Sequence, residues 1–300
     1  MKNISKLLFA FSFCISAASC SINDMYVRVS LIVMESKILA LNHETDYEMV
    51  RDTLPENIAS LENLLLRDSD NAELHIHAAN AYYVYAFGFV EDMDKRRASS
   101  LYYRGFEHGK QALRNFGVSN AMLNGPTDKL EHAVRKLDKH AIDALFFTAL
   151  CWSKYIEMNA AQLIGMIQLH KVVILMQRVH ELDDQHRMGG ANMFFGTYYG
   201  SRPPIMGGDF SKSRHYFEKA HKQNQNKLLM VDFLQARYLF LQQGDRQAFH
   251  NSLTKIINTS DNLLPEQALL NAIARKKAAY LLDKEDQLFE QGKSYNQIAY

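Results

Sequence analysis

The sequence predicts an all-α protein made of antiparallel helical hairpins, stacked as a superhelix similar to tetratricopeptide repeats. Apolar residues recur at helical spacing through most of the 300 residues. Only 5 prolines occur, and almost all of them lie outside these periodic segments. Small and large residues also recur at the positions of a helical hairpin repeat of about 34 residues. A chain that is 47% hydrophobic is long enough to bury one substantial helical body.

Charge excludes one class of partner. The 34 basic and 33 acidic residues give a net charge of +1, so the chain has no charge excess that would attract nucleic acid. Two short basic runs, Lys95–Arg97 and Arg275–Lys277, are predicted to be solvated helix faces.

The first 19 residues predict a signal peptide (1–19). Lys2 and Lys6 precede the apolar stretch Leu7–Ile15, and small residues follow. Cys20 comes directly after them, and ISAASC resembles a bacterial lipoprotein cleavage site, in which the cysteine is acylated, in part with palmitate. We therefore expect Cys20 to anchor the chain in a lipid bilayer. The alternative is ordinary secretory cleavage beside an incidental cysteine.

The remaining cysteine is predicted to be structural. Cys14 would leave with the signal peptide, which leaves Cys151 without a disulfide partner. Its neighbours in Ala144–Tyr155 form an apolar helix, and a reactive thiol needs an accessible, electropositive setting. We interpret Cys151 as a small core residue rather than a nucleophile.

The first elements follow from apolar spacing and capping signals. Val27–Leu41 predicts an amphipathic helix rather than a membrane span. Thr53–Glu56 and Asp70–Glu73 have capping-box spacing and predict helices that start near residues 54 and 71. Arg97–Phe116 is the expected antiparallel partner of the second, and Gly117–Asp128 is the expected loop after it.

The central hairpin spans Ala191–Lys222. A helix is expected to end at Pro203 and Pro204, followed by a tight turn with positive φ at Gly207-Gly208. Asp209 is the expected N-cap of the next helix.

Further helices are predicted on both sides of this hairpin. They cover Leu130–Leu137, Ala141–Asn159, Ala161–Glu181, Lys227–Gln243, Asp245–Ile257 and Pro265–Leu282. Gly244 and Asp245 are the expected C-cap and N-cap of one connection. Because the apolar pattern lapses beyond Lys284, we expect one helical domain over residues 20–284 and a frayed tail over residues 285–300.

Searches for catalytic and metal-binding motifs fail on spacing. His75 and His77 lie two residues apart on a helix and so face different directions. His180-Glu181 resembles the start of a zinc-protease motif, but the next histidine is His186, six residues on. We therefore expect no catalytic site, metal or cofactor. An enzyme on a helical scaffold is the weakest of the alternatives considered.

Two helices of the chain carry more aromatic surface than their packing against each other requires. One group, on the helix predicted near residue 71, is Tyr82, Tyr83, Tyr85 and Phe89. Aromatic stripes usually pack in a core, and the alternative is that this group lines a groove for an apolar ligand or a partner segment.

Phe194–Ala220 resembles the T component of TRAP (tripartite ATP-independent periplasmic) transporters. The family pattern FxGxYYxxxPxxxGG stands here as FFGTYYGSRPPIMGG, followed by SKSRHYFEKA. The resemblance covers about Leu31–Asn258. By position, the family-motif residues are Phe195, Gly196, Tyr198, Tyr199, Pro203, Gly207 and Gly208. They are expected to fix the helix–turn–helix, or alternatively to line a ligand cleft.

This resemblance implies a lipid-anchored protein of tetratricopeptide-like helices on the periplasmic face of a bacterial membrane. It also implies a homotrimer that binds the transporter's solute-binding subunit and helps to pass an apolar ligand. We therefore interpret the protein as an adaptor that binds another molecule and does not catalyse a reaction. The alternative is a general cell-envelope scaffold of the same fold that binds peptides or proteins.

Overall fold

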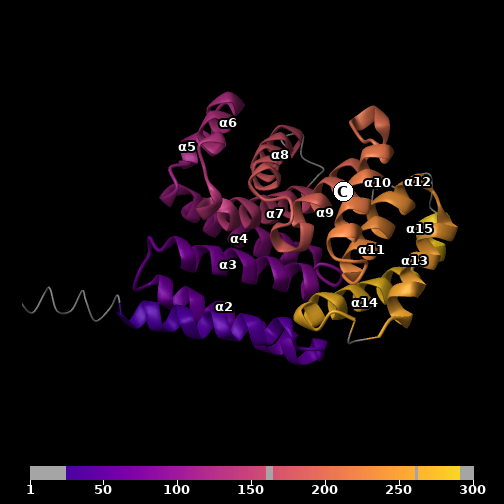
Figure 1. Cartoon of the computed structure of the whole chain (residues 1–300), viewed down its shortest axis with the longest axis horizontal. Helices are drawn as coiled ribbons and strands as arrows, with labels where there is room; N and C mark the ends of the chain where they lie inside the picture. Colours follow the sequence, from indigo (N-terminus) through magenta and orange to yellow (C-terminus); the bar gives the residue numbers. More distant parts are fainter. Residues whose placement is uncertain (1–24, 160–164, 261–262, 291–300) are drawn as a thin grey trace, which may run out of the picture.

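The computed structural model describes residues 25–159, 165–260 and 263–290, and all regular structure within these residues is helical. The all-α prediction is confirmed (Figure 1). The signal peptide, Cys20 and the last ten residues lie outside the described residues. None of the described helices combines the length and the apolar character that a membrane span requires.

The helices and their bounds are a first helix over residues 25–42, α2 (Tyr47–Leu65), α3 (Ala72–Tyr85), α4 (Lys95–Asn115), α5 (Asn120–Asn124), α6 (Thr127–Arg135), α7 (Ile142–Met158), α8 (Gly165–Leu182), α9 (His186–Gly200), α10 (Phe210–Gln223), α11 (Leu229–Gln235), α12 (Leu241–Gln243), α13 (Arg246–Asn258), α14 (Ala268–Asp283) and α15 (Glu285–Glu290). Two π turns, η1 (Ala86–Val90) and η4 (Ala236–Phe240), continue α3 and α11, and short 3-10 turns are η2 (Lys139–Ala141), η3 (Pro204–Met206) and η6 (Pro265–Gln267).

The helices pack in chain order. α3 lies between α2 and α4, α4 packs against α7, and α7 packs against α8. Figure 1 shows these helices as successive rows, with α10 to α15 grouped at the other end of the molecule. α14 also contacts α2 and η1, so the end of the chain returns to its beginning.

Two large apolar clusters and one small cluster hold the helices together. One large cluster joins α2, η1 and the C-terminal helices, and it includes Phe217, Phe233 and Phe249. The other joins α3 to α9, with Leu145 and Phe195 among its buried members. The small cluster packs the first helix against α2 and α3. Burial of such side chains contributes about 25 cal/mol per Å² of apolar surface and is the main stabilising term.

Several predicted helix ends are confirmed. Asp209 accepts a hydrogen bond from the Lys212 backbone N–H at 2.9 Å and caps α10. Gly244 adopts the left-handed conformation after α12, with φ of 71°. Asp245 then caps α13 by accepting from the Ala248 N–H.

The start of α2 corrects the prediction of a helix beginning near residue 54. Asp46 caps α2, accepting from the backbone N–H groups of Glu48 and Met49, and Pro55 lies inside the helix. The buried side chain of Val50 lies ahead of the predicted start. Apolar packing therefore extends α2 upstream and overrides the local preference of proline for a first turn.

Three further expectations are corrected. Asn71 rather than Asp70 caps α3. The predicted loop 117–128 contains α5 and the start of α6, because Leu123 is buried and anchors a short helix. The segment predicted to begin the frayed tail forms α15, in which Leu288 is 5% exposed. The tetratricopeptide assignment itself stays a prediction.

Candidate functional site

The connection between α9 and α10 is a turn held by backbone hydrogen bonds. The Gly207 N–H donates to the Pro204 carbonyl at 3.0 Å, and the Gly208 N–H donates to the Pro203 carbonyl at 3.2 Å. The Asp209 N–H donates back to the Tyr199 carbonyl at 3.0 Å. These bonds, together with the fixed φ of two prolines, leave the turn little conformational freedom.

The two glycines of this turn serve different purposes. Gly207 has φ of 84°, with open space where a Cβ would stand. Gly208 does not share this positive φ; instead, a Cβ there would lie 1.8 Å from the Arg202 carbonyl oxygen. The prediction of a positive φ therefore holds for Gly207 only, and Gly208 is needed for the close approach of the chain to itself.

A third glycine sets the distance between α9 and α10. A Cβ at Gly196 would lie 2.9 Å from the ring of Phe217. The Ser213 hydroxyl donates to the Gly196 carbonyl at 2.7 Å across the same contact. The helices can approach this closely only because Gly196 has no side chain.

The aromatic residues of the family motif form a ring cluster with Tyr216 of α10. The Phe195 and Tyr216 ring centroids are 5.1 Å apart, and Tyr199 stacks on Tyr216 at 5.9 Å. Tyr198 carries the Arg202 guanidinium over its face at 3.8 Å, a cation–π distance. Neither of the two hollows described below is lined by these residues.

The predicted aromatic group on α3 divides into two pairs. Tyr82 is fully buried and donates to the Glu62 carboxylate at 2.5 Å, while Tyr83 stacks on Phe87 at 5.7 Å. Tyr85 and Phe89 instead line a surface hollow. The structure thus brings two of the four predicted residues to a concave surface. Of the other two, Tyr82 is buried and Tyr83 is half-buried.

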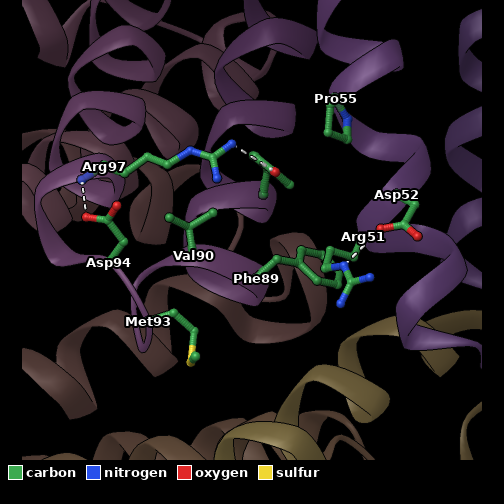
Figure 2. A pocket seen from close by; sticks show the side chains of 9 residues that line it. Arg51, Asp52, Pro55, Phe89, Val90, Met93, Asp94 and Arg97 are labelled. Carbon is green, nitrogen blue, oxygen red and sulfur yellow. Dashed lines mark hydrogen bonds and ion pairs between the residues drawn. The ribbon is translucent and has the colours of Figure 1, made fainter.

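This hollow lies between α2 and the segment that joins η1 to α4, as Figure 2 shows. Its volume is about 390 Å³, within the range of small-ligand sites. Apolar surface comes from Phe89, Val90 and Pro55. Two guanidinium groups, those of Arg51 and Arg97, also line it.

Neighbouring groups orient both arginines. The Arg97 guanidinium donates to the Tyr85 hydroxyl at 3.2 Å, and Arg51 donates to the Asp52 carboxylate at 2.9 Å. Pro55 has no N–H, so the Arg51 carbonyl lacks its usual intrahelical donor beside the hollow. The hollow therefore combines an apolar wall with two arginines and the carboxylates of Asp52 and Asp94.

A second hollow, of about 700 Å³, lies between the end of α4 and α6. Lys129, His132 and Lys136 line it together with Phe116 and Met122. None of the residues singled out from the sequence lines it.

The feature that sequence reasoning missed is a buried polar junction. We use this name for three carboxylates, three cations and two tyrosines from five segments of the chain: Glu91, Asp92, Tyr102, Lys154, Glu157, Arg237, Tyr238 and Lys277. Its centre is Glu91, whose side chain is 1% exposed.

Glu91 has four partners. Its carboxylate lies 2.9 Å from the Lys277 ammonium, 3.0 Å from that of Lys154 and 3.1 Å from the Arg237 guanidinium. The Tyr102 hydroxyl donates to it at 2.6 Å. Burial alone would raise the pKa of Glu91, but the three cations and the tyrosine outweigh burial and hold this pKa well below 4.5.

Charge balance explains why the junction can exist inside the protein. An unpaired ion costs several kcal/mol to bury, and the three carboxylates here match the three cations. Burial lowers the pKa of Lys154, but the Glu157 and Glu91 carboxylates more than offset this and raise it well above 10.5. Glu157 in turn accepts from the Tyr238 hydroxyl at 3.0 Å.

Both π turns meet at this junction. Glu91 follows η1 directly, and its N–H donates to the Ala86 carbonyl five residues back. Arg237 and Tyr238 lie inside η4. The extra residue in a π turn changes the direction of the side chains that follow, and π turns are frequent at functional sites.

Lys277 corrects the prediction of a solvated Arg275–Lys277 face. Lys276 is exposed as expected, whereas the Lys277 side chain is 2% exposed and paired with Glu91 and Asp92. The available signal was the position of Lys277 and Lys154 within apolar helices.

Among the described residues, one group has the ligand atoms of a possible metal site. Atoms of Glu35, Glu73 and His77 lie within 4.8 Å of one another. A structural zinc site usually needs four ligands, and both carboxylates are exposed. We assign no metal to this group.

Cys151 lies in the core, as predicted. Its thiol is fully buried and donates to the Ala79 carbonyl at 3.4 Å. Burial raises the pKa of this thiol, which opposes formation of the reactive thiolate.

Comparison with known proteins gives two findings. Residues 43–289 match the family described as TRAP transporter T-component. An uncharacterized protein of Treponema pallidum (strain Nichols) is 20% identical, over 91% of this chain and 94% of that protein.

Proposed function

Because this chain belongs to the T-component family of TRAP transporters, we propose that it is an adaptor that binds the transporter's solute-binding subunit. The extent of the family match carries this proposal, since residues 43–289 include nearly all of the described helices from α2 onward. The family is one of transporter components, and we propose no catalytic step.

The turn between α9 and α10 is the proposed contact surface. Ile205 in this turn is 94% exposed, although the turn is fixed on both sides by hydrogen bonds. A preorganised loop loses little conformational entropy on binding. An exposed isoleucine on such a loop suits an apolar pocket in a partner, with Arg202 and Lys212 close enough in the chain to add polar contacts.

The hollow lined by Tyr85 and Phe89 is the proposed site for a small apolar ligand. Its aromatic wall would hold the apolar part, and Arg51 and Arg97 would bind an acidic end if the ligand has one. The family-motif residues Phe195, Tyr198 and Tyr199 then have a structural role, because they pack the hairpin that presents Ile205.

Membrane attachment is proposed to occur through acylated Cys20, on the periplasmic face. The test is incorporation of a labelled fatty acid into the chain, which Cys20→Ser should abolish. Incorporation that persists in Cys20→Ser, or none in the unaltered chain, would contradict the anchor. The homotrimer, proposed on the resemblance alone, is tested by the mass of the purified protein in light scattering.

The adaptor proposal is tested by calorimetry with solute-binding subunits of TRAP transporters from the same genome. Ile205→Glu should weaken the complex at least about tenfold, the loss expected for an anchor residue. Ile257→Glu, on α13 and 40% exposed, is the matched control and should bind normally. Failure of the unaltered chain to bind, with and without ligand, would overturn the proposal. Binding of extended peptides instead would favour the general scaffold.

A further inference from the structure

The first helix, residues 25–42, is apolar on two opposite faces. Val27, Leu31 and Met34 are 2–7% exposed and pack against α2 and α3. The opposite side carries six large apolar residues that are 49–63% exposed: Met25, Tyr26, Val29, Ile32, Val33 and Leu39. We call these six residues the outer strip.

The outer strip is the main concentration of exposed apolar surface in the described part of the chain. Twelve large apolar side chains are exposed there, and six of them lie on this one helix. At 100° per residue the strip occupies about 140° of the helix circumference. No charged residue of the helix falls within this arc. Figure 1 draws the helix (indigo) at the edge of the molecule, beside α2.

Chain length relates the outer strip to the proposed anchor. Met25 follows Cys20 by five residue steps, so their Cα atoms lie at most about 17 Å apart. Five of the six strip residues lie between Met25 and Val33, at the end of the helix nearer to Cys20. The family match begins only at residue 43, so the shared family pattern does not account for this helix.

Charge at the edges of the strip fits a lipid surface. Arg28 and Lys37 flank the strip on its two sides and are exposed. The Arg67 guanidinium lies 5.0 Å above the ring of Tyr26. Long basic side chains at the border of an apolar face can reach anionic headgroups while that face enters the interface. The exposed acid of this helix, Glu35, lies beside Glu73 and His77 of α3.

We propose that the outer strip lies in the surface of the lipid bilayer and holds the protein in one orientation there. The inference rests on the proposed anchoring of Cys20, because the acyl chains bring the strip to the membrane. A lipid tether alone would leave the helical body free to turn. With the strip docked, α2 and α3 lie next to the membrane, and α5, α6 and α8, drawn on the opposite side in Figure 1, face away from it.

The test uses the mature chain with Cys20→Ser, so that no acyl chain contributes. It is mixed with vesicles of phosphatidylethanolamine and phosphatidylglycerol, and bound protein is measured by flotation. We expect binding, and we expect Ile32→Glu and Val29→Glu each to weaken it at least about tenfold. Ile257→Glu is the matched control, since it places the same charge on an exposed isoleucine of α13, away from the strip.

Each outcome is decisive. Absence of vesicle binding by a Cys20→Ser chain with an unchanged circular dichroism spectrum would overturn the proposal. So would an equal loss of vesicle binding in Ile257→Glu. Self-association in light scattering that Ile32→Glu abolishes would also overturn it, because the strip would then be an interface between copies of the chain. Vesicle binding in a chain that incorporates no fatty acid would refute the anchor and leave the strip intact.

Discussion

The α9–α10 hairpin and the buried polar junction both position helices, by opposite means. In the hairpin, small and aromatic residues close together in the chain fit against one another, with Gly196 against Phe217. In the junction, charged residues from four segments of the chain, together with Tyr102 from a fifth, meet at Glu91. The packing of the hairpin depends on the shapes of its side chains. The junction depends on the balance of its buried charges.

The largest expected effect is from removal of the central charge of the junction. Glu91→Gln leaves Lys154, Arg237 and Lys277 buried around an uncharged group, which costs about 3–5 kcal/mol of unfolding free energy. Chemical denaturation measures this loss.

The control for that variant is an exposed ion pair. Asp70→Asn removes the partner of Arg114, and both side chains are at least half exposed. Its effect should stay within about 1 kcal/mol. Equal losses of unfolding free energy in the two variants would mean that the buried junction stabilises the protein no more than an exposed ion pair does.

The next effect is from overpacking of the hairpin. Gly196→Leu forces a side chain against the Phe217 ring and should cost about 1–3 kcal/mol. Thermal unfolding followed by circular dichroism measures the loss. A melting temperature equal to that of the unaltered chain would show that α9 and α10 can separate without cost.

A smaller loss of unfolding free energy is expected for alanine substitutions at the two glycines of the turn, and the two losses should differ. Gly207→Ala meets no atom but must keep a positive φ, which costs about 1–2 kcal/mol. Gly208→Ala should cost more, because its Cβ would meet the Arg202 carbonyl. The reverse order in denaturation experiments would contradict the description of the turn.

The smallest expected effect is the change of unfolding free energy when the pH is lowered from neutral to 4.5. The folded pKa of Glu91 lies below its unfolded value near 4.5, so its stabilisation is complete above pH 4.5 and is lost as the pH falls through the folded pKa. The unfolding free energy should therefore change little between neutral pH and pH 4.5, and fall below it. Glu91→Gln should remove part of that acid dependence, and an identical slope in both chains would argue against this assignment.

The same contrast explains what the sequence could predict. Helix periodicity and caps such as Asp209 and Gly244 are local, and the structure confirms them. Pro55 was misjudged because apolar packing extends α2 upstream of a residue that usually starts helices. The family-motif turn was visible as a pattern, whereas only the structure separates the roles of Gly207 and Gly208.

The junction could not be predicted because its members are up to 186 residues apart, from Glu91 to Lys277. Local charge patterns place lysines on solvated faces, and that rule failed for Lys277. The division of the aromatic group, with Tyr82 inside and Phe89 at a hollow, also depends on how α2 and α4 pack around α3.

The buried thiol of Cys151 has a practical consequence. In a chain whose Cys20 is acylated or replaced and whose signal peptide is gone, it is the one remaining sulfhydryl. A maleimide cannot reach it until α7 comes away from α3 and α4. The rate at which the reagent modifies the protein therefore reports how often α7 separates from α3 and α4.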